Sequence, residues 1–212
     1  MKKALSVIII LALIGGVFWL NQKNKKTPAE NLNTAYRSTR LGIFFTYPKI
    51  LTASTTSEKV TLHHSVPFTH HDYCDFKGEG TTTIDTLTDF NVDFYTTEKG
   101  LVDSMKSESP YIPQENFING EVVESSGFID KYTVGKLNGF KIFEGAEGCG
   151  RTIYYFPISN KKTLIVTEEL VTVFTGAIDT ENKEKAEAVE GVINKEKETE
   201  ILEAVLKTIE VR

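Results

Sequence analysis

Cysteine, proline and tryptophan are scarce in this chain of 212 residues, and the familiar catalytic motifs are absent. Two cysteines are too few for a dense disulfide framework, and 6 prolines with 15 glycines are too few for a low-complexity chain. There is no Gly-x-Ser-x-Gly elbow, no Gly-x-x-x-x-Gly-Lys phosphate loop, no Gly-x-Gly-x-x-Gly and no long internal repeat. With 40% hydrophobic and 25% charged residues, the composition predicts a globular protein built around a hydrophobic core.

Long uncharged runs are also rare, but one stands near the N-terminus. Residues 4–20 (ALSVIIILALIGGVFWL) carry no charge and a single hydroxyl, on Ser6. As a helix this run spans roughly 25 Å, and lysine side chains at its ends extend that reach toward the ~30 Å of a hydrocarbon core. Residues 1–26 therefore predict one transmembrane helix with basic flanks, in contact with the lipid bilayer through residues 4–20.

The N-terminal segment has two readings, an uncleaved signal anchor and a cleaved signal peptide. The sequence after the apolar run offers no Ala-x-Ala cleavage site, and no cysteine follows before Cys74, which disfavours a lipid-modified N-terminus. We expect an uncleaved anchor. The lysines on its two sides are nearly balanced, so the positive-inside count alone does not orient it. A start-type anchor favours a cytoplasmic N-terminus and an extracytoplasmic C-terminal domain in the cell membrane.

Acidic charge dominates the part of the chain that follows the predicted anchor. Residues 1–26 hold 5 of the 24 basic side chains and none of the 29 acidic ones, so the remainder has 29 acidic against 19 basic side chains, a net charge of −10. Nucleic acid requires a basic face, and we expect no nucleic-acid partner. An envelope protein is the expected partner besides the lipid.

The pattern after the anchor predicts a polar linker over residues 27–40 and an α+β domain over residues 41–212. Apolar and polar residues alternate in segments that predict strands, at residues 41–48, 58–64, 89–96, 128–136, 140–144, 151–157 and 163–174. Asn138-Gly139 predicts the turn of a tight hairpin. Glu168-Glu169 predicts an edge position or a bulge for the last strand. Residues 98–108 and 198–209 show helical spacing. Strands that are neighbours in sequence favour an antiparallel sheet with helices packed on it.

Two segments carry a resemblance to a known family. The opening Gly42-Ile43-Phe44-Phe45-Thr46-Tyr47-Pro48 and the closing amphipathic helix (ILEAVLKTIE) resemble the PsbP-like domains, over most of residues 41–212. That resemblance implies an α/β/α sandwich around an antiparallel sheet, and a binding or accessory role without catalysis. It places no functional residue of the family on a position of this chain.

The histidines form the one cluster of potential metal-ligand side chains in the sequence. All four, His63, His64, His70 and His71, lie within nine residues, and Asp72 follows them. Imidazole and carboxylate groups are transition-metal ligands, and a hairpin at residues 65–68 would bring the two pairs together. The cluster is a candidate site for Zn or Cu. Because adjacent strand residues point to opposite faces, solvated loop histidines are the alternative reading.

Cys74 and Cys149 are the only cysteines, 75 positions apart. Outside the cytoplasm such a pair favours a disulfide over a metal or nucleophile role. Acidic pairs such as Asp85 with Asp89 are expected by chance among so many carboxylates. The leading hypothesis is a membrane-anchored binding or accessory module without catalytic activity. Metal binding or delivery through His63 to His71 is the alternative, and a small envelope hydrolase is the second alternative.

Overall fold

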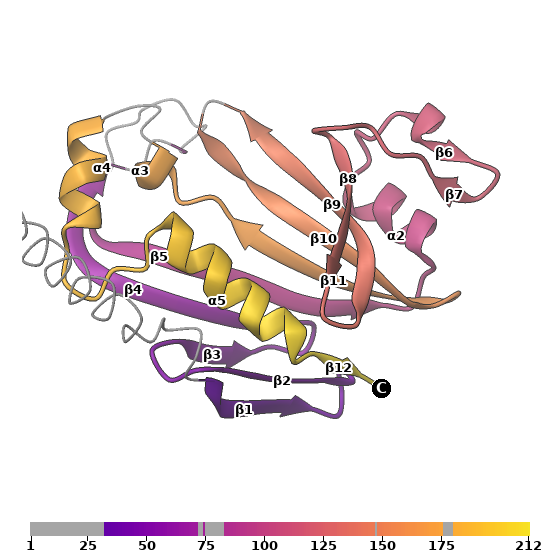
Figure 1. Cartoon of the computed structure of the whole chain (residues 1–212), viewed down its shortest axis with the longest axis horizontal. Helices are drawn as coiled ribbons and strands as arrows, with labels where there is room; N and C mark the ends of the chain where they lie inside the picture. The colour runs from indigo at the N-terminus through magenta and orange to yellow at the C-terminus, as the bar shows by residue number, and fades with distance from the viewer. Residues whose placement is uncertain (1–31, 72–73, 75–82, 147, 176–179) are drawn as a thin grey trace, which may run out of the picture.

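A seven-stranded antiparallel sheet forms the centre of the protein in the computed structural model, which describes residues 32–71, 74, 83–146, 148–175 and 180–212 (Figure 1). The strands run in the order β3 (Thr52–Thr55), β4 (Val60–His71), β5 (Thr83–Thr97), β11 (Lys162–Glu169), β10 (Cys149–Ser159), β9 (Leu137–Ala146) and β8 (Ile129–Val134). Each neighbouring pair is antiparallel. The predicted α+β class with an antiparallel sheet is confirmed.

Smaller elements surround this sheet. A three-stranded sheet contains β1 (Leu32–Ser38), β2 (Ile43–Pro48) and β12 (Glu210–Val211), and a short hairpin contains β6 (Phe117–Ile118) and β7 (Glu121–Val122). The helices are α2 (Leu101–Glu108), the 3-10 turn η2 (Gln114–Asn116), α3 (Thr172–Thr175), α4 (Thr180–Glu187) and α5 (Lys195–Lys207). None of the helices in the described ranges has both the length and the apolar character that a membrane crossing needs. The predicted anchor, residues 1–26, lies outside those ranges.

Helix α5 covers one face of the large sheet, as Figure 1 shows. Its apolar stripe, Ile201, Leu202, Val205 and Leu206, is buried against residues of β4, β5, β10 and β11. Asn194 caps the helix, since its side chain accepts a hydrogen bond from the backbone N–H of Lys197 at 3.1 Å. This cap explains why α5 begins three residues before the predicted start.

Helix α2 and the segment that follows it cover only part of the opposite face. Met105 of α2 and Ile112 pack on a layer of apolar residues from β8, β9, β10 and β11. This layer consists of Ile129, Ile142, Ile153, Tyr155 and Ile165. The apolar rows stop at β11, because the cross-strand neighbour of Ile153 is Thr167 and the neighbour of Thr167 is Asp93. The β4–β5 part of this face is therefore polar, and so is its border, formed by Thr167 and Glu169 of β11, Arg151 of β10 and Glu144 of β9.

Three sequence-based expectations about strands differ from the structure. Residues 32–38 of the predicted linker form β1, because Tyr36 stacks on Phe45 at 4.9 Å between ring centroids and pairs with it across β1 and β2. β4 does not turn at residues 65–68 but continues through Pro67 to His71, with irregular register on either side of that proline. β11 is central, between β5 and β10, so the expected edge position is wrong, and the strand ends at Glu169 instead of reaching Phe174.

The predicted Asn-Gly turn is also wrong. β8 and β9 turn at Gly135 and Lys136, where Val134 pairs with Leu137 and Gly135 has a φ of 58°. Gly139 lies within β9 instead. A Cβ on Gly139 would meet the carbonyl oxygen of Tyr155 at 1.9 Å, so this glycine is required by close approach of the β10 backbone.

We predict that Gly139→Ala lowers the free energy of unfolding by about 3 kcal/mol or more, because the added methyl group must push β9 away from β10. Gly120→Ala is the matched control, since its φ is positive but nothing lies within 4 Å of its would-be Cβ. It should cost about 1 kcal/mol. Urea denaturation measures both variants. Equal losses in the free energy of unfolding would contradict the close approach at Gly139 and favour a turn at Asn138-Gly139.

Candidate functional site

The predicted metal-ligand histidines lie along one strand. His63 and His64 precede His70 and His71 by seven positions on β4, or roughly 20 Å or more at the rise of an extended chain. His63 and His64 point to opposite faces, and Asp72 lies outside the described residues. The described residues contain no group of three or more His, Cys, Asp or Glu side chains placed to hold a metal ion. Metal binding by these residues stays a prediction.

His64 belongs to a buried polar contact beneath the turn that precedes α5. Its Nδ1 lies 2.6 Å from Oδ1 of Asp89, which is fully buried. The other oxygen of Asp89 accepts the backbone N–H of Ile193 at 2.7 Å. The register between β4 and β5 shifts at this point, because His64 pairs with Phe90 and Ser65 pairs with Thr88. The bulge brings Asp89 to the α5 side, where its carboxylate holds the backbone next to the helix.

A second polar contact lies under the first turn of α5. Lys195 Nζ donates to Oε1 of Glu168 at 2.8 Å and to Oε2 of Glu198 at 3.0 Å. The hydroxyl of Tyr154 donates to the other oxygen of Glu168 at 2.7 Å. Glu168 and Glu198 are both buried, and Oε1 of Glu198 has no hydrogen-bond partner among the described residues. One lysine thus serves two buried carboxyl groups.

Burial and the neighbouring Glu168 raise the pKa of Glu198 to about 7, although Lys195 opposes the change. Burial also raises the pKa of the Tyr154 hydroxyl, and the negative charge of Glu168 raises it further. Two buried carboxylates with one ammonium group would carry an uncompensated charge, so Glu198 takes up a proton near neutral pH. The two carboxyl groups are buried between the sheet and the helix, while the Lys195 side chain remains about half exposed, and together these contacts anchor α5.

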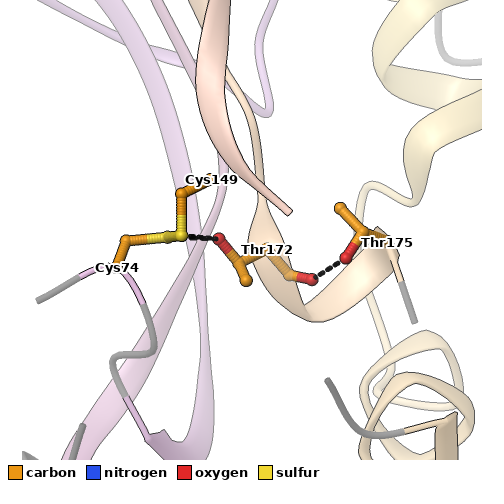
Figure 2. The surroundings of a disulfide bond; sticks show 4 residues. All are labelled: Cys74, Cys149, Thr172 and Thr175. Carbon is orange, nitrogen blue, oxygen red and sulfur yellow. Dashed lines mark hydrogen bonds between the residues drawn. A yellow bond between two sulfur atoms is a disulfide. The ribbon is translucent and has the colours of Figure 1, made fainter. Parts of the chain in front are cut away.

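The two cysteines form the predicted disulfide. Cys74 and Cys149 are bonded, with their Cα atoms 5.6 Å apart (Figure 2). The hydroxyl of Thr172, in α3, lies 2.7 Å from the sulfur of Cys74, and the hydroxyl of Thr175 donates to the carbonyl oxygen of Thr172 at 2.7 Å. The bond joins the beginning of β10 to the chain beyond β4 and closes a loop of 75 positions. Closing a loop of that length stabilises the fold by roughly 4 kcal/mol on the chain-entropy model.

The polar half of the sheet face opposite α5 is the strongest candidate for a binding surface. We call it the open face, because no described element covers it. Its residues come from five neighbouring strands and are mostly half-buried. They are Thr61, His63, Asn91, Asp93, Tyr95, Thr167, Glu169, Arg151 and Glu144. Two hollows of about 280 and 410 Å³ meet at Arg151, the second beside the disulfide.

Charged pairs fix the side chains of the open face. Asp93 accepts from Lys59 Nζ and from the hydroxyl of Thr61, both at 2.5 Å. Arg151 Nε donates to Glu144 at 2.8 Å. Burial raises the pKa of Glu169, an effect that the attraction of Arg151 only partly offsets. Burial and hydrogen bonding to Glu144 also shift the Arg151 pKa, in opposite directions, with a net rise.

Tyr95 forms the border between the open face and α2. Its hydroxyl donates to Oε2 of Glu108, the last residue of α2, at 3.0 Å. Burial raises the pKa of Tyr95 well above its usual value, and the charge of Glu108 raises it further. The phenol therefore stays protonated at ordinary pH, and can act there only as a hydrogen-bonding group.

Comparisons with known proteins add little to this geometry. No family model matches the chain, and no curated protein matches it. Among solved structures, the fold is similar to that of a protein from Bacteroides thetaiotaomicron VPI-5482, solved at 1.50 Å resolution, with a TM-score of 0.44 and 8% sequence identity. The match covers 85% of this chain and 49% of that protein, so the chain spans about half the length of the protein it matches.

Sequence reasoning found some of these residues and missed others. The alternation in residues 89–96 predicts that Asn91, Asp93 and Tyr95 form the polar face of a strand, which the structure places on the open face. The sequence predicts an edge position or a bulge at Glu168, whereas the structure buries this residue on the central strand β11. The only signal near Glu168 in the sequence is the apolar residues on both sides of it. These residues do not reveal that Lys195, 27 positions later, lies against Glu168.

Stability should depend on pH through Glu198. Its pKa in the folded protein, about 7, exceeds the usual 4.5, so the folded state holds the proton more tightly and the resulting stabilisation is lost as pH rises through 7. Relative to Glu198→Gln, the wild-type free energy of unfolding should fall by on the order of 2 kcal/mol between pH 5 and pH 8. The exposed Glu196→Gln should behave like wild type. Parallel pH profiles for wild type and Glu198→Gln in urea denaturation would contradict this account.

Proposed function

We propose that this protein is a membrane-tethered, extracytoplasmic binding module that contacts its partner through the open face. The open face carries the proposal, since it is the half of the sheet that keeps half-buried polar groups where the other half is apolar and covered by α2. A polar sheet face with fixed side chains and adjoining hollows supports recognition of another molecule. The role is that of an accessory protein without turnover of a substrate.

The disulfide supports the extracytoplasmic location. Disulfides form and persist in oxidising compartments and are rare in the cytosol. The bond between Cys74 and Cys149 lies in the same chain as an N-terminal run of 17 uncharged residues, 4–20. In the proposed topology, residues 1–26 anchor the protein with its N-terminus in the cytoplasm, and the bond forms on the other side of the membrane.

The layer arrangement supports the PsbP-like resemblance of the sequence. An antiparallel sheet with α5 on one face and α2 on the other corresponds to the sandwich that this resemblance implies. The resemblance also favours a binding or accessory role over catalysis. The distance between the two histidine pairs along β4 favours this role over metal delivery by all four histidines.

The topology is tested by expressing the full chain with a C-terminal tag in a bacterial host and separating membranes from soluble proteins. We predict that the tag is found in membranes and is digested by protease added to intact spheroplasts. Both cysteines should resist a maleimide reagent until the protein is reduced. Deletion of residues 1–26 should give soluble protein whose cysteines react without reduction.

A Cys74→Ser variant is the control for the thiol measurement, because it leaves Cys149 without its bonding partner and should make it reactive on unfolding without reduction. Protection of the tag in intact spheroplasts, together with maleimide labelling of the unreduced wild-type chain, would place the domain in the cytoplasm. That outcome would contradict the proposed function.

A further inference from the structure

Acidic side chains outnumber basic ones on the open face and along its border. The two hollows that meet at Arg151 are lined by five carboxylates and two cationic groups. The carboxylates belong to Glu58, Asp93, Glu108, Glu144 and Glu169, and the cations to Lys59 and Arg151. Both cations already pair with carboxylates, Lys59 with Asp93 and Arg151 with Glu144. Three carboxylates, those of Glu58, Glu108 and Glu169, form no ion pair with a lysine or arginine among the described residues, although Arg151 and Lys59 attract Glu169 from a greater distance.

Glu169 shows what this excess of carboxylates costs the protein. It follows Glu168 at the end of β11, next to Arg151 on the neighbouring strand, and is half-buried. Its burial costs solvation that the protein's own positive charges do not restore, which is why its pKa rises. A cationic group from another molecule would replace the lost solvation of the Glu169 carboxylate by a charge-assisted hydrogen bond. Burying the rest of this carboxylate would then cost less than burying it without a partner.

We infer that the open face and its border bind a basic segment of a partner protein, in which one lysine or arginine side chain meets Glu169 in one hollow and at least one more meets Glu58 and Glu108 in the other. This inference rests on the proposed function, because it names the partner of the same surface. Charge complementarity favours this occupant, and the net charge of −10 after residue 26 attracts such a segment over a longer range.

The size and shape of the surface favour a protein segment over a metal ion. The two hollows, about 280 and 410 Å³, extend from the β3–β4 turn and β5 to the disulfide and have room for whole side chains. Their acids are spread over α2, the β3–β4 turn and three strands, and none of the described residues forms a cluster with three metal-ligating groups. Thr61 lies between the charges, and its hydroxyl, which donates to Asp93, can still accept a hydrogen bond from the backbone N–H of an extended segment.

The test is calorimetric titration of the full chain, in a non-ionic detergent, with hexalysine and with hexaglutamate at low salt. Wild type should bind hexalysine and not hexaglutamate, and the affinity should fall as KCl is added. The triple variant Glu58→Gln, Glu108→Gln and Glu169→Gln should lose at least about tenfold in affinity, which is a reasonable loss for three charge-assisted contacts.

The matched control removes the same number of charges from another surface. Glu181, Glu184 and Glu187 are exposed on α4. Changing all three to glutamine should alter hexalysine affinity by less than about twofold, since water and salt screen their charges. If the open-face variant is unstable, the single Glu169→Gln should still weaken binding about threefold or more while α4 variants do not.

Several outcomes would overturn the inference. Equal losses in the two triple variants would mean that hexalysine responds only to net charge. Binding of hexaglutamate in place of hexalysine would reverse the partner's chemistry. Much stronger competition by calcium chloride than by KCl at the same ionic strength would assign the carboxylates to a divalent ion. Each of these results leaves the fractionation and thiol measurements unchanged, so it is distinguishable from a failure of the proposed topology.

Discussion

Coverage of the central sheet is the constraint on which the rest of the structure depends. Seven strands present two broad faces to solvent, and apolar residues on either face must be buried by another element. α5, β2 and the short helices α3 and α4 bury one face, and α5 does so through a four-residue stripe in which each buried leucine or isoleucine contributes about 1.5–3 kcal/mol. α2 is shorter and buries only the part of the other face that Ile129, Ile142, Ile153, Tyr155 and Ile165 form. The remaining part can be stable only if its residues are polar, and Thr61, Asp93 and Thr167 meet that requirement.

The attachment of α5 explains how buried charges serve the fold. Asp89 holds the backbone before the helix, and Glu168 with Glu198 holds Lys195 in its first turn. All three carboxyl groups are buried, so each depends on its hydrogen bonds for compensation. The proton on Glu198 completes that compensation near neutral pH. On the open face, by contrast, Glu169 reaches solvent and can be compensated by a group from another molecule.

Local sequence patterns predicted the strands and helices better than they predicted what packs against them. The alternation of β2 and β5, the stripe of α5 and the disulfide were predictable, because each depends on the spacing of a few residues or on a single pair. The hairpin turn was misplaced, since the need for glycine at position 139 comes from the β10 backbone and leaves no mark in the neighbouring residues. The open face was only half predictable. Its polar strand was visible in sequence, but the lack of a covering helix depends on how far α2 extends across the sheet.

The most direct test of the account is to map hexalysine binding on the full chain in detergent by backbone amide NMR. The account predicts that the largest shift changes fall on residues of the open face, such as Asp93, Arg151 and Thr167, with small changes at Thr199 on the exposed side of α5. Changes concentrated on α4, or spread evenly over the acidic surface, would contradict the claim that the uncovered half of the sheet is the binding surface.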